Sequence, residues 1–434
     1  MNRSLLHSAS FFAIFFVASI AGSSAATAQS DGVYYDVPVL KEAQPMDIDD
    51  RYDLMRYSDF TVSTDAQVST LYNDNVYRTK DNTSSDFITE FSPTFRGQSR
   101  WDQHELGFRA AADFGLYTDE TDLNYTDFDF SVFGRYDFSD MIRARIGAQY
   151  RYDHSSVGED PDQPDTSLAE PPIYKNLVFN AGLDGQLSHK YSYDFDLRSI
   201  IYDFDNTRRR DGNISIYDDK DRTEYKALMT LNYLISPTYT LYGQLGVNMI
   251  NYDKRIDSTL LYNHDANGQL FMLGLKRQEQ YYNWDIAAGY RGQDYDSNVF
   301  KDTNIFDVRA NLNMRLDIAT DVDLYLHRDI RESSSTGVSS YISSRIGGQI
   351  DHRFSHSWSS SAGMRYTIND FQTNTRLNPI DREDKLFEPH AEIRYHINDN
   401  ALIGLEYRYQ DRSSNDSSVE YDANMIGLRF KYSP

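Results

Sequence analysis

The sequence has no cysteine among its 434 residues, which excludes disulfide frameworks, thiolate metal sites and cysteine nucleophiles. Basic side chains are fewer than acidic ones, 43 against 66, and the formal charge of -23 argues against nucleic acid as a partner because phosphates would be repelled. Beyond the N-terminal segment, no apolar run approaches the roughly 20 residues of a membrane-spanning helix. A helical membrane protein is therefore excluded, and any chemistry must come from oxygen and imidazole groups.

Aromatic residues are abundant: the chain contains 34 Tyr and 24 Phe, and 40% of its residues are hydrophobic. That much ring surface can be buried, which distinguishes the chain from a disordered acidic segment. The length by itself allows either several soluble domains or one large barrel.

The first 28 residues are typical of a secretory signal peptide. Arg3 precedes an apolar run at 11–20, and small residues follow up to Ala28. A membrane anchor is the alternative, but the run is much shorter than the roughly 20 residues that a spanning helix needs. We expect cleavage near Ala28 and export from the cytoplasm. Residues 29–57 lack a regular period and are expected to form a periplasmic arm or a partial plug.

From residue 58 onward, apolar and polar residues alternate in blocks of about ten, which is the period of β-strands with one apolar and one polar face. The block at 142–152 shows the pattern clearly. Ile142, Ile146 and Tyr150 share one face, and Arg143 and Arg145 belong to the other. Similar blocks recur to the end of the chain.

The connections between blocks alternate in length. Short polar turns occur near 139–140, 188–189 and 236–237, whereas longer polar segments such as 154–173 and 204–221 lie between them. Tight turns at one end and long loops at the other are typical of an outer-membrane barrel. The sequence therefore predicts an all-β protein, with a single transmembrane antiparallel β-barrel of about 18 strands at 58–434. Its short turns should be periplasmic and its longer loops extracellular.

A soluble sandwich or propeller would also alternate apolar and polar residues. Two features argue against it. Much of the apolar face is Ala, Gly, Tyr and Phe rather than long aliphatic residues, and aromatic residues gather at block ends, as in the girdles that anchor a barrel at headgroup level. The girdle candidates are Tyr150, Tyr152, Tyr407, Tyr409, Phe430 and Tyr432.

By the same alternation, one set of charged residues should face the lumen. Both signs are present, so cross-strand pairs can form and no single field makes the lumen selective for anions or cations. These side chains are either structural pairs of the wall or a hydrophilic path whose guanidinium groups meet a sugar chain. The candidates are Arg109, Arg135, Arg143, Arg145, Arg151, Arg291, Arg309, Arg315, Arg345, Arg365, Arg394, Asp113, Asp184, Asp307 and Glu392.

Two polar motifs at the loop end are candidate sites. Arg208-Arg209-Arg210 is either a solvated loop or a site for an anionic saccharide or a lipopolysaccharide phosphate. His154-Ser155-Ser156, continuing the outward face of its strand, resembles the His-x-Ser pair of outer-membrane lipid hydrolases, with Asn124 as a third partner. The hydrolase alternative is disfavoured because such a short pattern is common by chance. We therefore predict no catalytic site, no cofactor and no metal.

The region from about 52 to 156 resembles the putative beta-barrel porin 2 family of bacterial outer-membrane proteins. The resemblance is carried by residues 72–77, 85–88 and 154–156, by Ser92-Pro93, and by Trp101 with His104-Glu105-Leu106. It implies a single barrel of about 18 strands in the Gram-negative outer membrane. It also implies an association with exopolysaccharide or capsule systems.

The expected function is a polar passage, most simply for export of exopolysaccharide or capsule. A passive porin for small polar solutes and a closed surface barrel stay open as alternatives. The expected partners are outer-membrane lipid and lipopolysaccharide, the barrel-assembly machinery, a saccharide substrate and a periplasmic polysaccharide exporter. Epitopes inserted at 159–165 or 208–213 should be reachable on whole cells, and one at 236–237 should be hidden.

Overall fold

The computed structural model describes residues 55–57 and 59–434, except 163, 254–262, 334, 336 and 375–380. The expected signal peptide and most of the expected N-terminal arm lie outside these residues. Within the described part of the chain, no helix is long and apolar enough to cross a membrane.

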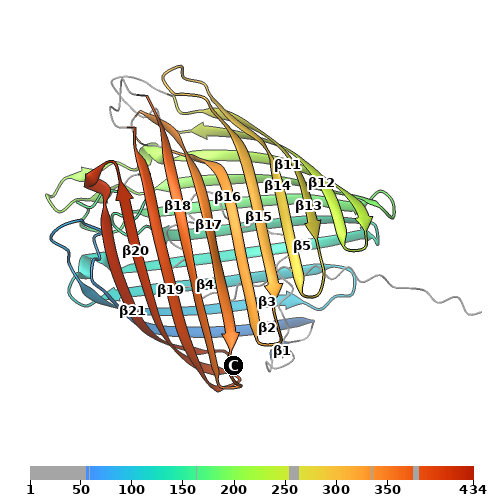
Figure 1. Ribbon diagram of the computed structural model, residues 1–434, viewed down its shortest axis with the longest axis horizontal. Helices are drawn as coiled ribbons and strands as arrows, with labels where there is room; N and C mark the ends of the chain where they lie inside the picture. The colour runs from blue at the N-terminus through green and yellow to red at the C-terminus, as the bar shows by residue number, and fades with distance from the viewer. Residues whose placement is uncertain are drawn as a thin grey trace, which may run out of the picture.

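Eighteen antiparallel strands form a closed barrel, as the sequence predicted (Figure 1). Each strand pairs with the next along the chain, and β2 pairs with both β3 and β21, which closes the sheet. A closed sheet has no open edge, which is the condition for strands in a bilayer. The strands are β2 (Phe60–Asn73), β3 (Asp86–Ser99), β4 (Glu105–Tyr117), β5 (Tyr125–Ser139), β6 (Ile142–His154), β7 (Ile173–Gln186), β8 (Tyr191–Phe204), β11 (Arg222–Ser236), β12 (Tyr239–Tyr252), β13 (Ala266–Arg277), β14 (Tyr282–Tyr295), β15 (Thr303–Arg315), β16 (Thr320–Glu332), β17 (Val338–Arg353), β18 (Trp358–Thr373), β19 (Glu383–Asn398), β20 (Ala401–Ser414) and β21 (Tyr421–Tyr432).

Short strands and single-turn helices lie at the two ends of the barrel. At the turn end, β1 (Met55–Tyr57) pairs with the first residues of β2. At the loop end, β9 (Thr207–Arg208) and β10 (Ile214–Ser215) form a small hairpin. Among the described loop residues, three single-turn helices occur: η1 (Thr121–Leu123), η2 (Asp218–Lys220) and η3 (Ser417–Val419).

The two faces of the sheet follow the alternation in the sequence. Ile146 is 68% exposed on the outside of β6 and Leu245 is 59% exposed on the outside of β12. Arg145 and Gln244, the residues just before them, point to the inner face, because successive side chains of a strand point to opposite sides. An apolar outer band of this kind is suited to the hydrocarbon core of a bilayer rather than to water.

The largest apolar cluster among the described residues lies at the loop end of the barrel. Val157 and Leu168 of the loop between β6 and β7 pack with Tyr174 and Tyr202 of the inner wall and with Tyr77 of the first long loop. All five side chains are almost fully buried. The first long loop and the loop between β6 and β7 therefore pack inside the barrel, a position that the alternation of the strands does not predict.

Candidate functional site: the inner wall and a loop that crosses it

The charged residues predicted to face the lumen form ion pairs with one another and with their neighbours. Ten of the eleven arginines form such pairs across or along the strands. These pairs join Arg109 and Arg151 to Asp129, Arg135 to Glu105, Arg143 and Arg145 to Asp184, Arg291 to Asp307, Arg315 to Asp321, Arg345 to Asp329, Arg365 to Glu388, and Arg394 to Glu392. The wall is thus lined by charges of both signs that largely compensate one another.

Arg309 takes a different set of partners. Its guanidinium donates hydrogen bonds to the Tyr242 hydroxyl, at 3.0 Å, and to the Gln244 side chain, at 3.1 Å. Tyr242 in turn donates to Asp285. An inward ring, an amide and a guanidinium thus lie together on β12 and β15, with Tyr242 and Gln244 buried by their neighbours.

The girdle candidates lie on the outer face of the barrel. Tyr150, four residues before the loop end of β6, is 42% exposed, and Tyr407, in the middle of β20, is 45% exposed. Tyr152 and Tyr409, two residues further along the same strands, are half-buried. Near the turn end, Phe430 is 42% exposed and Tyr432, the last residue of β21, is 45% exposed. The rings near the strand ends are at positions that the headgroup regions of a bilayer would cover, whereas Tyr407 at mid-strand is not.

The loop at 155–172, here called the crossing loop, spans the mouth of the barrel. It starts at β6 and returns at β7, yet Ser333 Oγ, in the connection between β16 and β17, donates a hydrogen bond to Asp162. Six strands separate β7 from β16 in one direction, and eight separate β6 from β17 in the other. The contact therefore joins opposite sides of the barrel.

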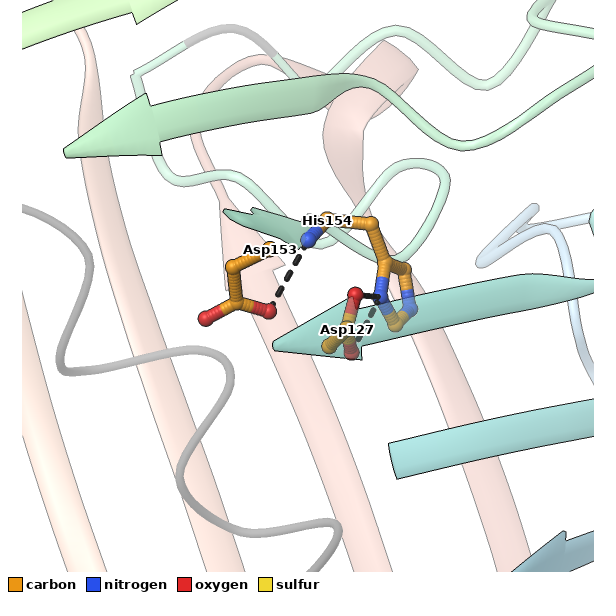
Figure 2. Close-up of side chains that lie close together, drawn as sticks. All are labelled: Asp127, Asp153 and His154. Carbon is orange, nitrogen blue, oxygen red and sulfur yellow. Dashed lines mark hydrogen bonds and ion pairs between the residues drawn. The ribbon is translucent and has the colours of Figure 1, made fainter. Parts of the chain in front are cut away.

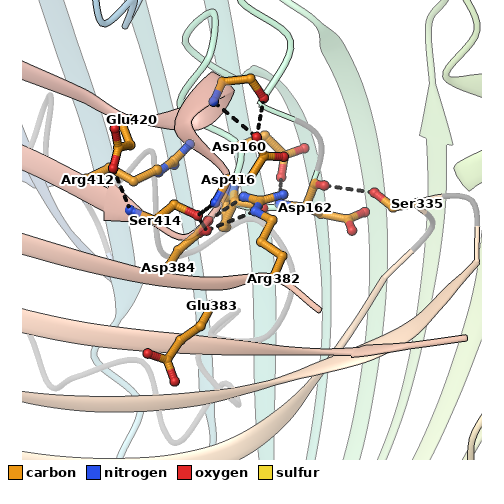
Figure 3. Close-up of polar contacts among 12 residues, drawn as sticks. Asp160, Asp162, Ser335, Arg382, Glu383, Asp384, Arg412, Ser414, Asp416 and Glu420 are labelled. Carbon is orange, nitrogen blue, oxygen red and sulfur yellow. Dashed lines mark hydrogen bonds and ion pairs between the residues drawn. The ribbon is translucent and has the colours of Figure 1, made fainter. Parts of the chain in front are cut away.

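The tip of the crossing loop is held by side chains from several parts of the wall. Arg412 of β20 donates to the backbone carbonyls of Gly158, at 3.1 Å, and Glu159, at 2.6 Å. Arg382 donates to the carbonyl of Pro161 at 2.8 Å. Figure 3 shows Arg382 and Arg412 beside Asp160 of the loop. Because guanidinium groups are strong donors, they fix the loop backbone in place.

The acidic side chains of the tip also meet cations. Lys220 Nζ lies 3.2 Å from an Asp160 oxygen, and Arg78 Nη2 lies 3.9 Å from a Glu159 oxygen. Gln410 donates a further bond to Glu159 at 2.9 Å. Lys220, Arg78 and Glu159 are all at least nine-tenths buried, so these charges depend on their partners.

The electrostatics of the tip follow from this pairing. Burial alone would raise the pKa of Glu159, but Arg78, Gln410 and Arg412 outweigh it and the pKa lies below its ordinary value. Burial alone would lower the pKa of Lys220, but Asp160 and Asp162 outweigh it and the pKa lies above its ordinary value. Both groups are therefore charged near neutral pH.

The arginine triplet at 208–210 attaches the crossing loop to its neighbour. Arg209 Nη1 lies 3.0 Å from Asp165, and the Arg210 guanidinium lies 4.5 Å from the centre of the Tyr77 ring. The backbone amide of Arg210 donates to Ser167 at 2.9 Å. Arg208 and Arg210 are exposed and Arg209 is half-buried, which agrees with a solvated loop that also contacts the crossing loop. A site for an anionic saccharide or a lipopolysaccharide phosphate at this triplet stays a prediction.

The His154-Ser155-Ser156 motif does not form the predicted arrangement. His154 was expected on the outward face, but it is 3% exposed and its Nδ1 lies 2.9 Å from Asp127 of β5. Its ring stacks on Tyr125 at 3.9 Å. Asn124 is exposed and accepts a hydrogen bond from the Tyr117 amide instead. The His154 side chain contacts inward-facing residues of β5, which the alternation does not predict.

Figure 2 shows His154 with Asp127 and Asp153, which come from β5 and β6. One ligand atom of each lies within 4.8 Å of the others, so the group has the donor types of a metal site. However, Asp153 accepts hydrogen bonds from the His154 amide, at 2.9 Å, and the Tyr174 hydroxyl, at 2.8 Å. These bonds already explain the arrangement, and we assign no ion.

Sequence reasoning missed the residues that hold the crossing loop. Arg78, Lys220, Arg382 and Arg412 lie far apart in the chain, and only the closed barrel brings them to one tip. One signal was present in the sequence: the segment at 155–172 is long, carries acidic residues and ends in Pro171-Pro172.

Comparison with known proteins agrees with the fold. A family model described as putative beta-barrel porin 2 matches residues 55–433, nearly the whole described chain. The chain belongs to the putative beta-barrel porin 2 family. This porin-family membership supports an outer-membrane barrel and a transport role. No curated protein matches.

Several solved structures resemble this family member at low sequence identity. OpdK, an outer membrane protein of Pseudomonas aeruginosa, is 12% identical with a TM-score of 0.44, over 86% of this chain and 98% of that one. OccAB4 of Acinetobacter baumannii is 10% identical with a TM-score of 0.45, over 87% and 99%. The copper transporter OprC is 7% identical with a TM-score of 0.47, over 88% and 82%.

Proposed function

We propose that this barrel is a gated passage through the outer membrane for saccharide chains, used for the export of exopolysaccharide or capsule. The observation that carries the proposal is the inner wall, where polar side chains of both signs continue along the strands to a mouth crossed by one loop. Paired charges supply donors and acceptors without a strong net field, which suits a chain rich in hydroxyl groups.

A passive porin for small polar solutes is the second candidate. The crossing loop disfavours it, because buried ion pairs and hydrogen bonds hold that loop across the mouth, and a permanently open pore needs no such contacts. A closed surface barrel is the third candidate, and the polar inner wall disfavours it because such a wall is not needed for anchoring alone. A periplasmic polysaccharide exporter would deliver the chain to the turn end of the passage. The barrel-assembly machinery would insert the barrel into outer-membrane lipid and lipopolysaccharide.

The test is a deletion strain. We expect loss of surface polysaccharide, measured on washed cells, and its restoration by the full-length protein. Unchanged polysaccharide together with reduced uptake of small solutes would favour the passive porin instead. Unchanged levels of both would leave the closed barrel.

A hydrolase role needs a separate assay. Purified protein in mixed micelles of phospholipid and detergent should release no fatty acid. Release of fatty acid would overturn the proposal that the protein acts only as a conduit.

A further inference from the structure

The tip of the crossing loop is acidic, and four cations surround it; one of them, Arg382, also pairs with Asp384. Glu159, Asp160 and Asp162 lie within four consecutive positions of the chain. Around them are Arg78 from the first long loop and Lys220 from η2. Arg382, just before β19, and Arg412 of β20 bond the same stretch of backbone. Four cations from four separate segments thus converge on five residues of the loop, 158–162.

Three of these four cations are almost fully buried. Arg78 is 5% exposed, Arg412 is 1% exposed, and Lys220 is fully buried. Taking a cation out of water carries a large penalty unless an anion or several acceptors compensate it. The crossing loop supplies that compensation through its carboxylates and its backbone carbonyls.

A saccharide chain that passes where the tip lies must displace the tip, which reaches from β6 to the far wall. When it leaves, Arg78 loses Glu159 and Lys220 loses Asp160. These cations would then face the lumen with their compensation reduced. An occupant that carries carboxylates along an extended chain can take the place of the loop at the lowest penalty.

We propose that the acidic tip is an internal stand-in for the transported chain, and that the basic mouth is a binding site for an anionic saccharide of the polyuronate type. The inference rests on the proposed passage and names its substrate class. The loop and the saccharide carboxylates compete for the same cations, so arrival of the chain displaces the loop. In the absence of substrate the loop occupies the site and closes the mouth.

The test compares binding to the purified full-length protein in detergent micelles. The probe is an oligogalacturonate, and the neutral comparison is a maltooligosaccharide of equal length, both followed by calorimetry. The test variant, E159Q/D160N/D162N, removes the competing carboxylates. We expect it to bind oligogalacturonate on the order of tenfold more tightly than the unmodified protein, with no change for the neutral chain.

The matched control has the same change in charge at exposed positions near the same end, D81N/D211N/D294N. It should bind as the unmodified protein does. Equal tightening in both triple variants would overturn the proposal, since general charge would then explain it. Inorganic phosphate displacing the oligogalacturonate at equal charge would overturn the saccharide class.

A second pair of measurements covers a failure of the test variant to fold, which is checked by its heat-dependent mobility on gels. As single substitutions without the triple change, K220Q and R412Q should each weaken oligogalacturonate binding. Unchanged binding in both would overturn the inference. No binding of oligogalacturonate alongside lost surface polysaccharide in the deletion strain would reject the substrate class and leave the passage standing. Binding as expected together with normal surface polysaccharide in the deletion strain would reject the passage and leave the binding site standing.

Discussion

Gly158 shows how one residue shapes the tip of the crossing loop. Its backbone has a φ of 72°, which glycine adopts far more easily than any other residue. A Cβ at this position would lie 2.8 Å from the carbonyl oxygen of Tyr77. The carbonyl of Gly158 also accepts a hydrogen bond from Arg412. The close approach to Tyr77 and the bond to Arg412 therefore both occur at Gly158.

We predict that Gly158→Ala loosens the crossing loop. The left-handed conformation alone should cost about 1–2 kcal/mol, and the clash with Tyr77 adds to it. The measurement is hydrogen exchange of amides at 155–172. Gly212→Ala is the control, because Gly212 has a φ of 84° but no atom within 4 Å of the added Cβ. Equal protection at 155–172 in the two variants would contradict the role assigned to Gly158.

His264 predicts a pH dependence at the residue scale. Its side chain is fully buried against Phe300, with ring centres 3.7 Å apart. Burial, together with the charge of Arg222, lowers its pKa from 6.5 to about 3. The folded protein therefore binds this proton less readily than the unfolded chain, so the stability is complete above pH 6.5 and falls as the pH drops toward 3.

The expected loss is about 1.4 kcal/mol for each pH unit within that window. It is measured as unfolding free energy in urea, in detergent micelles at pH 7 and pH 5. His264→Phe should remove this part of the pH dependence. His356→Phe, at an exposed turn, should leave it in place, and a similar effect of both substitutions would refute the assignment.

At the scale of elements, the alternation of apolar and polar residues explains which face each strand residue occupies, but it does not explain where the loops lie. In β4, Ala110 pairs with Phe95 and Phe130 on the outer face, whereas Ala111 pairs with Thr94 and Asp129. Two neighbouring alanines thus face hydrocarbon and lumen.

This contrast gives a test of register. Ala110→Arg places a charge in hydrocarbon near the middle of the strand, and we expect it to destabilise the barrel by about 2–4 kcal/mol. Ala111→Arg places the same charge opposite Asp129 and should have a small effect. Urea unfolding in lipid vesicles measures both. Equal losses would show that the register of β4 is misassigned.

At the scale of the whole molecule, the long loops differ in where they go. The hairpin of β9 and β10 keeps Asp211 and Gly212 exposed, whereas the tip of the crossing loop is buried in the mouth. The expectation that an epitope within 159–165 is reachable therefore changes.

We predict that an epitope after Asp211 binds antibody on whole cells and that one at Ser236-Pro237, a short turn, does not. An epitope after Asp160 should be unreachable or should disrupt the loop. Antibody labelling of intact and permeabilised cells measures all three. Labelling of the short turn on intact cells would reverse the orientation of the barrel.

The sequence alone determined the barrel. A period of two says which residues of a strand share a face, and alternating turn and loop lengths say how the strands connect; both are local properties that 18 strands repeat. Closure followed from the physics of lipid, which leaves no sheet edge hydrated. Because of the period of two, Arg143 and Asp184 could be assigned to the inner face from the sequence.

Only the tertiary structure decided what occupies the mouth. The crossing loop has no period, and its position depends on cations that are distant in the chain until the barrel closes. Asp162 and Ser333 are 171 positions apart. His154 likewise turns inward because Asp127 and the Tyr125 ring receive it there. Local alternation fixes a face, but a loop is placed by the sum of long-range contacts that local sequence does not encode.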